Sequence, residues 1–517
     1  MTQRLFLNSL SAAILYAVNI VIAFILSPIV VRELGNRDYG IWEMLLSFCG
    51  YFGILELGIG PAIIRYVARE VTLQNSEGLN RVFNSAFWGL LSAGLLALGV
   101  ISLAALWPER LLNLNPGEIS SLSALCVMAG LNLFVQFLGT LFVAFLMGRQ
   151  EYFKVNLFRS GFYIIQSFFI FLALTRWGGS KLLSIAIITL VGNIFQYLVL
   201  ALMSFGGENP AKFRKSAFSW DTVKEVYRFG FNSAVIMVSD RVQRQSLPLI
   251  IGHVSGAASV VFYALPKRLV DYARDFVMAM SMPLMPYFSS IDAVRRNETK
   301  MEEWFPASRA VSFLAMPAAG VLLVLGEPFL NIWIGPEYGA RGRWVVIFLS
   351  ASFWVTCAFS NASRVLIAGG QHGPPARKAL MISGVAILIA IPTTSFFGVS
   401  GSALVVFLAD LAADLVFWMA ASNYVSVGLS EHFNRTIKPL TVPILFLLIV
   451  LVAARWYADL SSYSDLAAAA FLSIGLYLAA AWRFALTSEE RVSVWSRLNK
   501  LSSNSVAGLL KAMRKSI

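Results

Sequence analysis

Five charged residues lie within an otherwise apolar stretch, and they are the first candidates for chemistry. The stretch reads ALPKRLVDYARDFVMAM, from Ala264 to Met280. At about 100° per residue, its charged side chains share one arc of about 120° on a helix. A charge at the bilayer centre costs roughly 2.5–3.5 kcal/mol on insertion scales, so such residues face a cavity or a partner. The five are Lys267, Arg268, Asp271, Arg274 and Asp275.

Further charges occupy other apolar stretches of the second half of the chain. In SAVIMVSDRVQRQ, the helix expected before this one, the polar side chains again fall on one face. Arg and Lys in a low-dielectric cavity suit a phosphate or carboxylate ligand, Arg by its planar fork and Lys as a point charge. The predicted substrate-binding residues are therefore Arg241, Arg244, Lys267, Arg268, Arg274 and Arg364.

An alternative is that these charges only pair with one another. Asp240 with Arg244, and Asp271 with Lys267 or Arg274, have the spacing of helical ion pairs. Pairing alone does not explain why so many charges gather in the second half, whereas the first half offers mainly neutral polar groups. We therefore expect a hydrated central cavity. Buried cations slightly outnumber buried acids in the second half, and the meaning of this surplus depends on which pairs close.

Two acids are spaced so that they can share a proton. Asp410 and Asp414 are four residues apart on one helical face, where two like charges disfavour each other. We expect them to couple transport to a H⁺ or Na⁺ gradient, and the alternative is that they only pair with Arg364 or another buried cation. Asp240 is a further coupling candidate, although its cationic neighbours make it a poorer carrier. No cofactor is expected.

Catalytic motifs are missing from the sequence. It contains no HExxH, Walker phosphate loop, GxSxG or DxD, and its three histidines are isolated. A metal or nucleophile site needs several convergent ligands. The three cysteines fall far apart in apolar stretches, which is typical of buried small side chains. The sequence therefore indicates that the protein is not an enzyme.

The composition is that of a membrane protein. Of 517 residues, 58% are apolar and 13% charged, and the mean hydropathy is +0.70. A span needs about 20 apolar residues, and we expect an all-α, polytopic protein with about fourteen spans. Most Lys and Arg fall on the cytoplasmic side if both termini are cytoplasmic, so the net charge of +13 marks topology rather than nucleic-acid binding. The expected spans are about 9–31, 39–58, 83–106, 119–147, 156–175, 182–205, 229–251, 258–290, 310–325, 344–369, 379–398, 402–424, 439–454 and 466–486.

The chain divides into two similar halves. VRELGNRDYGIW (Val31–Trp42) and LIIGHVSGAASVVFYAL (Leu249–Leu265) both put a glycine turn and an aromatic-Gly/Ala pair between the first two spans of a half. Parallel repeats are a known transporter plan, with the substrate between the halves. The expected parts are an N-terminal lobe (1–205), a cytoplasmic linker (206–228), a C-terminal lobe (229–428), two further spans (429–486) and a basic amphipathic cytoplasmic tail (487–517), which is suited to an anionic membrane surface.

One stretch resembles a known family. RELGNRDYGIWEMLLSFCGYFGILELGIGPAIIRYVARE, Arg32 to Glu70, is similar to the opening of polysaccharide repeat-unit flippases (Wzx-type), relatives of multidrug and toxin extrusion (MATE) transporters and lipid II flippases. The resemblance rests on Leu34-Gly35 with Tyr39-Gly40, on Leu55-Glu56-Leu57-Gly58, and on Arg65-Tyr66. The family's usual acid is Asp, whereas this chain has Glu56. The Asp240 region and Pro283 also resemble the family's second half.

The resemblance implies a MATE-like fold of two six-helix lobes and two extra helices, which opens alternately to each side. It implies that the cargo is an undecaprenyl-diphosphate-linked oligosaccharide, moved to the periplasmic leaflet of the bacterial inner membrane for O-antigen (lipopolysaccharide) or exopolysaccharide assembly. Implied partners are this lipid-linked oligosaccharide, membrane lipids, and polysaccharide polymerase and chain-length proteins, with no nucleic acid. Gating or structural roles are implied for Gly35, Glu56, Gly58, Arg65 and Pro283.

Two other transport functions remain open, and a purely structural role is a further class. A cation-coupled multidrug exporter would use acids such as Asp410, Asp414 or Glu43 for protons and leave the cavity anionic, which the surplus of buried cations opposes. A lipid II flippase would share the fold and a cationic cavity, but its usual first-helix pattern is not evident. A structural membrane protein would not place Arg and Asp on coherent inward faces.

Overall fold

The chain folds into helices joined by turns throughout the part that the computed structural model describes, which comprises residues 2–56, 58–112, 121–214, 218–281, 297–485 and 491. Long helices are the expected form for apolar runs in lipid, because the backbone groups must be satisfied within the segment. Ten helical segments are long and apolar enough to cross a membrane. The all-α, polytopic prediction is therefore confirmed. The predicted tail 487–517, apart from residue 491, lies outside the described residues, as does Pro283.

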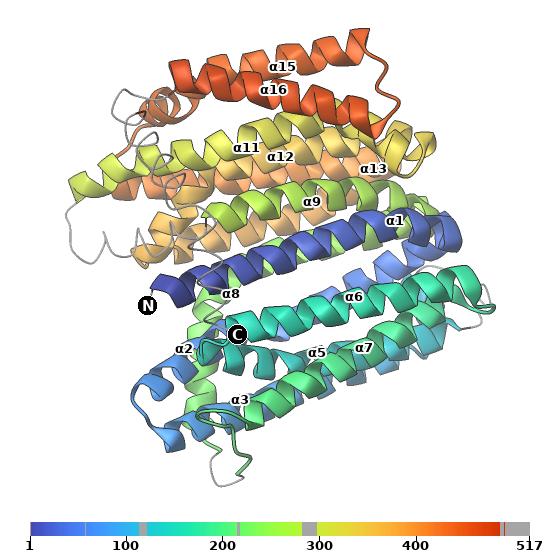
Figure 1. The fold of residues 1–517 in the computed structure, drawn as a ribbon, viewed down its shortest axis with the longest axis vertical. Coiled ribbons are helices and arrows are strands. Elements are labelled where there is room, and N and C mark those ends of the chain that lie inside the picture. Colours follow the sequence, from blue (N-terminus) through green and yellow to red (C-terminus); the bar gives the residue numbers. More distant parts are fainter. Residues whose placement is uncertain are drawn as a thin grey trace. The chain divides into compact units, whose positions relative to one another are not determined.

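By contact, the chain forms two compact units, which are described separately. The N-terminal unit comprises Phe6–Leu265 and Ala376–Ala409. Within it, α5 packs between α3 and α7, and α2 packs against α3, α5 and α8 (Figure 1). Its helices are α1 (Thr2–Phe52), η1 (Gly53–Glu56), α2 (Ile59–Thr72), α3 (Ser76–Ala104), α4 (Pro108–Leu112), α5 (Leu122–Gly148), α6 (Tyr152–Arg176), α7 (Lys181–Phe205), α8 (Trp220–Ser255), η3 (Ala257–Val260) and the first part of α13 (Gly373–Val425).

The C-terminal unit comprises Pro266–Pro375 and Asp410–Ile517, together with Met1–Leu5. Here α11 packs along α12, and α15 packs against α11 and α16 (Figure 1). The hydroxyl of Tyr477 on α16 donates a hydrogen bond to the Phe313 carbonyl of α11 over 2.9 Å. The unit contains α9 (Val261–Ser281, from Pro266 on), α11 (Asn297–Trp333), α12 (Pro336–Ala368), the rest of α13, α14 (Leu429–His432), η4 (Phe433–Ile437), α15 (Lys438–Tyr457) and α16 (Tyr463–Phe484).

Glycines with matching backbone angles interrupt the helices at the two predicted turns. Gly35 breaks α1 with φ 77° and ψ 166°, and Gly256 ends α8 with φ 84° and ψ 153°. These angles lie in a region that only glycine adopts readily. Both glycines precede the predicted aromatic-Gly/Ala pairs, so the likeness between the two stretches extends to the backbone. The lobe boundaries stay a prediction, because grouping by contact does not define which helices move together.

The linker between the predicted lobes is attached to the N-terminal unit. Asn80 of α3 accepts a hydrogen bond from the Lys212 backbone amide over 2.8 Å. Asn84 donates to the Lys212 carbonyl over 2.8 Å and accepts from the Arg214 amide over 3.1 Å. Ser219 then caps α8, which begins at Trp220, ahead of the apolar span expected from residue 229. Side-chain amides of α3 thus fix the path by which the chain enters α8.

Candidate functional site

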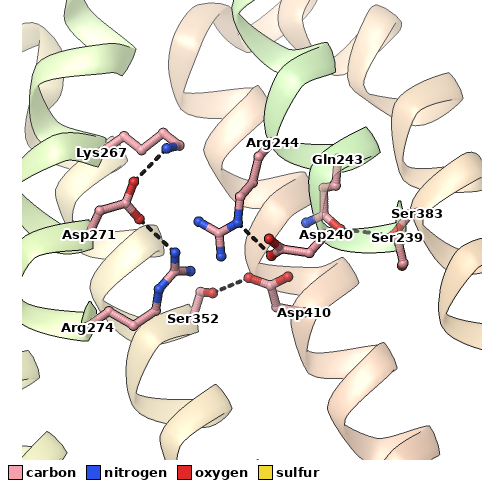
Figure 2. Close-up of polar contacts among 10 residues, drawn as sticks. All are labelled: Ser239, Asp240, Gln243, Arg244, Lys267, Asp271, Arg274, Ser352, Ser383 and Asp410. Carbon is pink, nitrogen blue, oxygen red and sulfur yellow. Dashed lines mark hydrogen bonds and ion pairs between the residues drawn. The ribbon is translucent and has the colours of Figure 1, made fainter. Parts of the chain in front are cut away.

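Helix α8 carries an ion pair close to buried polar contacts. Arg244 Nε lies 2.5 Å from Asp240 Oδ1, one helical turn away (Figure 2). Beside it, Ser383 of α13 lies 2.8 Å from the Ser239 hydroxyl and donates to Gln243 over 3.2 Å. These buried contacts fix the rotation of α8, and they place the Asp240–Arg244 pair on a more exposed side of the helix.

On α9, a single carboxylate is shared by two cations. Asp271 lies between Lys267, 2.5 Å away, and Arg274, 3.0 Å away (Figure 2). All three side chains are between 17% and 25% exposed, so the cluster is neither buried nor fully hydrated. The alternative that these charges pair along their helices is confirmed for Asp271 and for the α8 pair. Arg268 and Asp275 belong to the same helix, and each has an interaction partner.

Arg364 on α12 has a different environment, because its partners among the described residues are neutral. Its guanidinium donates to Asn361 Oδ1 over 2.7 Å and to the Ser360 hydroxyl over 3.0 Å. From α9, the Ser281 hydroxyl accepts over 2.6 Å and the Met278 sulfur over 3.6 Å. The proposed pairing of Asp410 or Asp414 with Arg364 is absent from this part of the chain. No described carboxylate bonds to the guanidinium of Arg364, so no ion pair among the described residues neutralises its positive charge.

Asp410 and Asp414 on α13 face hydroxyl groups of α12. Ser352 donates a short hydrogen bond to Asp410 Oδ2 (Figure 2), and Thr356 hydrogen-bonds Asp414. Ser352 and Thr356 are one turn apart, as are the two aspartates, so the helices present matched pairs. Asp414 Oδ2 is buried and has no hydrogen-bond partner among the described residues. The arrangement can hold a proton or a small cation.

A cavity of about 230 Å³ with both polar and apolar lining residues lies within the N-terminal unit. Arg241 enters it from α8, and its Nη1 donates to the Gly50 carbonyl over 3.4 Å. A Cβ atom at Gly53 would lie 1.8 Å from that nitrogen, so the guanidinium needs a glycine there. Helices α1, α5, α7 and α8 and the short η1 supply its polar and aromatic lining, namely Trp42, Glu56, Asn132, Gln136, Thr189 and Arg241.

Four of the five residues given gating or structural roles lie in or beside α1, η1 and α2. Glu56 faces the cavity, where it lies near the Thr140 hydroxyl and close enough to Arg241 for electrostatic attraction. Gly58 precedes α2 with a φ of 70°, a left-handed conformation that favours glycine. Gly35 forms the break in α1. Arg65 is exposed on α2, with its guanidinium 5.9 Å from the Tyr66 ring centre.

The structure thus distributes the predicted binding residues over several clusters. Within the N-terminal unit, Arg241 meets Glu56 and Arg244 meets Asp240; within the C-terminal unit, Lys267, Asp271 and Arg274 form one cluster. Their role in binding substrate stays a prediction. Glu56 is an acid of the first half and did not enter the count of intramembrane charges made from the sequence. When Glu56 is counted, the slight surplus of cations disappears.

Sequence reasoning missed several residues that complete these sites. Trp42 and Thr189 of the cavity were not candidates, nor were Ser352 and Thr356. A usable signal existed in Asn132 and Gln136, which share a face of α5 at a spacing of four residues. Among the described residues, no group of three or more His, Cys, Asp and Glu side chains could hold a metal ion.

Comparison with known proteins gives a consistent family. A family model described as polysaccharide biosynthesis protein matches residues 5–292. The uncharacterized membrane protein EpsK of Bacillus subtilis (strain 168) is 23% identical over 494 residues, covering 92% of this chain and 94% of EpsK. A putative O-antigen transporter of Shigella flexneri is 24% identical over 338 residues, covering 62% of this chain and 75% of that protein.

A solved structure has the same fold. The inward-facing conformation of a multidrug resistance MATE family transporter of the MOP superfamily superposes with a TM-score of 0.64 at 15% identity, covering 80% of this chain and 94% of that one. The predicted MATE-like fold is confirmed. Because the family model spans more than half of the chain, including the cavity and both charged helices, this multi-pass membrane protein belongs to the polysaccharide biosynthesis protein family.

Proposed function

We propose that this protein is a flippase that moves undecaprenyl-diphosphate-linked oligosaccharides from the cytoplasmic to the periplasmic leaflet of a bacterial inner membrane by alternating access. The product would supply O-antigen or exopolysaccharide assembly, and no chemical step is catalysed. The observation that carries the proposal is the family match over residues 5–292. The likeness to a putative O-antigen transporter supports it further.

The proposed topology has fourteen spans, with both termini cytoplasmic. Ten helical segments qualify by length and hydropathy. Two of them, containing α1 and α13, are broken at Gly35 and Gly398 and count as two spans each. Helices α8 and α9 are the remaining two of the fourteen proposed spans. Their charged faces lower their hydropathy but do not shorten them. Charges in such helices face a water-filled cavity or pair with one another.

The anionic part of the cargo is assigned to the C-terminal unit. Arg364 is held by hydroxyl, amide and thioether groups and bonds no carboxylate among the described residues. A diphosphate would therefore be its first anionic partner. Lys267 and Arg274 share one carboxylate and can turn toward a second anion. Charge-assisted bonds from such groups to phosphate are among the stronger hydrogen bonds in proteins.

The proposed coupling site is the Asp410/Asp414 pair. Its two acids lie one turn apart on α13 and contact hydroxyls of α12, and one buried oxygen of Asp414 has no hydrogen-bond partner among the described residues. Uptake of a proton or Na⁺ would remove negative charge from the unit that carries Arg364. A coupling ion can drive transport only if it favours one conformation over the other.

A cation-coupled multidrug exporter is the second candidate, and two observations favour it. A multidrug transporter shares the fold, and Glu56 gives the cavity an acid that offsets Arg241. A lipid II flippase would also share the proposed cationic features. The candidates differ in their cargo, so a cellular assay can separate them.

The test is deletion of the gene in its host, followed by complementation. The proposal expects loss of a surface polysaccharide, accumulation of lipid-linked oligosaccharide on the cytoplasmic side, and restoration by the wild-type gene. Susceptibility to cationic dyes should not change. A strain that keeps all its surface polysaccharide but becomes sensitive to dyes would favour the exporter, and loss of viability with accumulated lipid II would favour the lipid II flippase.

A further inference from the structure

The cavity of the N-terminal unit has the size of a compact ligand. Its volume of about 230 Å³ is far above the roughly 10–15 Å³ that a single water needs. It is smaller than the pockets of about 300–1,000 Å³ that hold drug-sized molecules. A single sugar ring matches this space.

Several polar groups of the lining have unused hydrogen-bonding capacity. The side-chain amide of Gln136 and the hydroxyl of Thr189 have no partner among the described residues. Asn132 Oδ1 accepts from Asn193 Nδ2 over 2.7 Å, which leaves its amide nitrogen as a donor. Donors and acceptors left unpaired in a semi-buried site cost free energy until water or a ligand satisfies them. A ligand rich in hydroxyl groups can both donate and accept here.

The charges of the lining favour an uncharged ligand. Arg241 and Glu56 face the same space and attract each other, so they contribute no net charge. An anion would be repelled by Glu56, and a cation by Arg241. Hydroxyl groups, in contrast, can accept from a guanidinium and donate to a carboxylate at once.

An aromatic side chain also belongs to the lining. Trp42, on the part of α1 that follows Gly35, is half-buried and faces the cavity. Its ring offers a flat apolar surface, and the C–H groups on one face of a pyranose ring pack well against such a surface. Amides, a charge-balanced pair and one aromatic ring together define a site for a neutral sugar.

We infer that this cavity binds one uncharged sugar residue of the lipid-linked cargo. The site rests on the proposed function, and it assigns the sugar to the N-terminal unit while the diphosphate is assigned to residues of the C-terminal unit. Arg241 acts here on sugar hydroxyls rather than on phosphate. The cavity, and not the cations of α9 and α12, then discriminates between sugars.

The test compares two kinds of lipid with purified full-length protein in nanodiscs. One is undecaprenyl diphosphate without sugar, and the others carry a single glucose, galactose or N-acetylglucosamine on that diphosphate. Wild-type protein should bind at least one glycosylated lipid about tenfold more tightly than the bare one. Ala186→Leu, which fills the cavity from α7, should abolish this gain and leave the bare lipid's affinity unchanged.

The control is Ala201→Leu, on the same helix at a position that does not line the cavity. It should retain the gain. Equal binding of bare and glycosylated lipids by the wild type, or a gain that survives Ala186→Leu, would overturn the inference while leaving the proposed function intact. If no diphosphate lipid binds at all, the proposed function itself fails. Thermal unfolding of each variant shows whether a loss reflects misfolding.

Discussion

The cavity of the N-terminal unit and the charged helices of the C-terminal unit use arginine in opposite ways. In the cavity, Arg241 faces Glu56 and a set of uncharged amide and hydroxyl groups. On α12, Arg364 is held by neutral groups alone among the described residues, and on α9 Asp271 is divided between two cations. The first region is balanced in charge, whereas these positions of the second retain positive charge.

This difference shows that the partners of a buried charge, rather than the numbers of cations and acids, determine which ligand that charge can bind. Cations and acids are nearly equal in number over the intramembrane stretches, so composition does not reveal where an anion would bind. A guanidinium that already faces a carboxylate gains little from a second anion, whereas one that is held by hydroxyl groups gains much. Substitutions that remove either kind of partner test this difference.

The largest effect is expected at the acids of the C-terminal unit. Asp410→Asn/Asp414→Asn should abolish the response of transport to an imposed H⁺ or Na⁺ gradient, because no titratable or cation-binding oxygen pair remains there. The measurement is transport in proteoliposomes with and without the gradient. Asp459→Asn, in the exposed loop after α15, is the control and should respond like the wild type. If the double variant also responds like the wild type, the coupling site lies elsewhere.

Loss of Arg364, the cation whose described partners are neutral, should have the next largest effect. Arg364→Ala removes charge-assisted bonds of about 1.5–3 kcal/mol, which corresponds to roughly 10–100-fold in affinity for undecaprenyl diphosphate. Arg364→Lys should recover part of the loss, because charge remains but the planar fork does not. Arg343→Ala, an exposed arginine on the same helix, should bind normally. Unchanged binding by Arg364→Ala would remove the distinction between the two regions.

Displacing Arg241 should affect the sugar and spare the diphosphate. A Cβ at Gly53 would lie 1.8 Å from Arg241 Nη1, the end of a flexible side chain, so Gly53→Ala should move the guanidinium rather than unfold the protein. We expect the gain from a bound sugar to fall by about tenfold, the equivalent of one hydrogen bond. Gly99→Ala, where the added carbon meets open space, is the matched control. A parallel loss of bare-lipid binding would show that Arg241 contacts phosphate.

Neutralising the shared carboxylate should have the smallest effect on binding and a measurable effect on stability. Asp271→Asn leaves Lys267 and Arg274 as neighbouring like charges, and the cost should be about 1–3 kcal/mol, between values for exposed and buried pairs. Affinity for the diphosphate should stay the same or rise. Glu337→Gln, which loses an exposed pair with Arg341, should cost about 0.5 kcal/mol or less. Thermal unfolding and lipid binding together give the answer.

Features set by local geometry could be predicted from the sequence, and those set by distant contacts could not. The pairs Asp240–Arg244 and Asp271–Lys267 follow from one helical turn, and Gly35 follows from the turn that it must form. The cavity depends instead on Arg241 reaching past Gly53, between segments far apart in the chain. No local pattern encodes that approach.

The same limit applies to the C-terminal unit. The sequence marks Arg364 as an intramembrane charge, but its partner Ser281 comes from another helix. Whether Arg364 meets an acid or a hydroxyl is decided by how α9 and α12 pack. Ten of the described helical segments meet the length and hydropathy expected of a span, whereas the charged helices α8 and α9 do not, so the total of fourteen spans stays a prediction.

Transport of a defined cargo in proteoliposomes tests the central claim most directly. Undecaprenyl diphosphate carrying a short oligosaccharide would be incorporated, and the fraction reachable by an external glycosidase would be followed over time. The account predicts that wild-type protein makes the whole pool accessible, whereas Arg364→Ala at equal protein density is much slower. Accessibility limited to one leaflet with the wild type, as in protein-free vesicles, would contradict it.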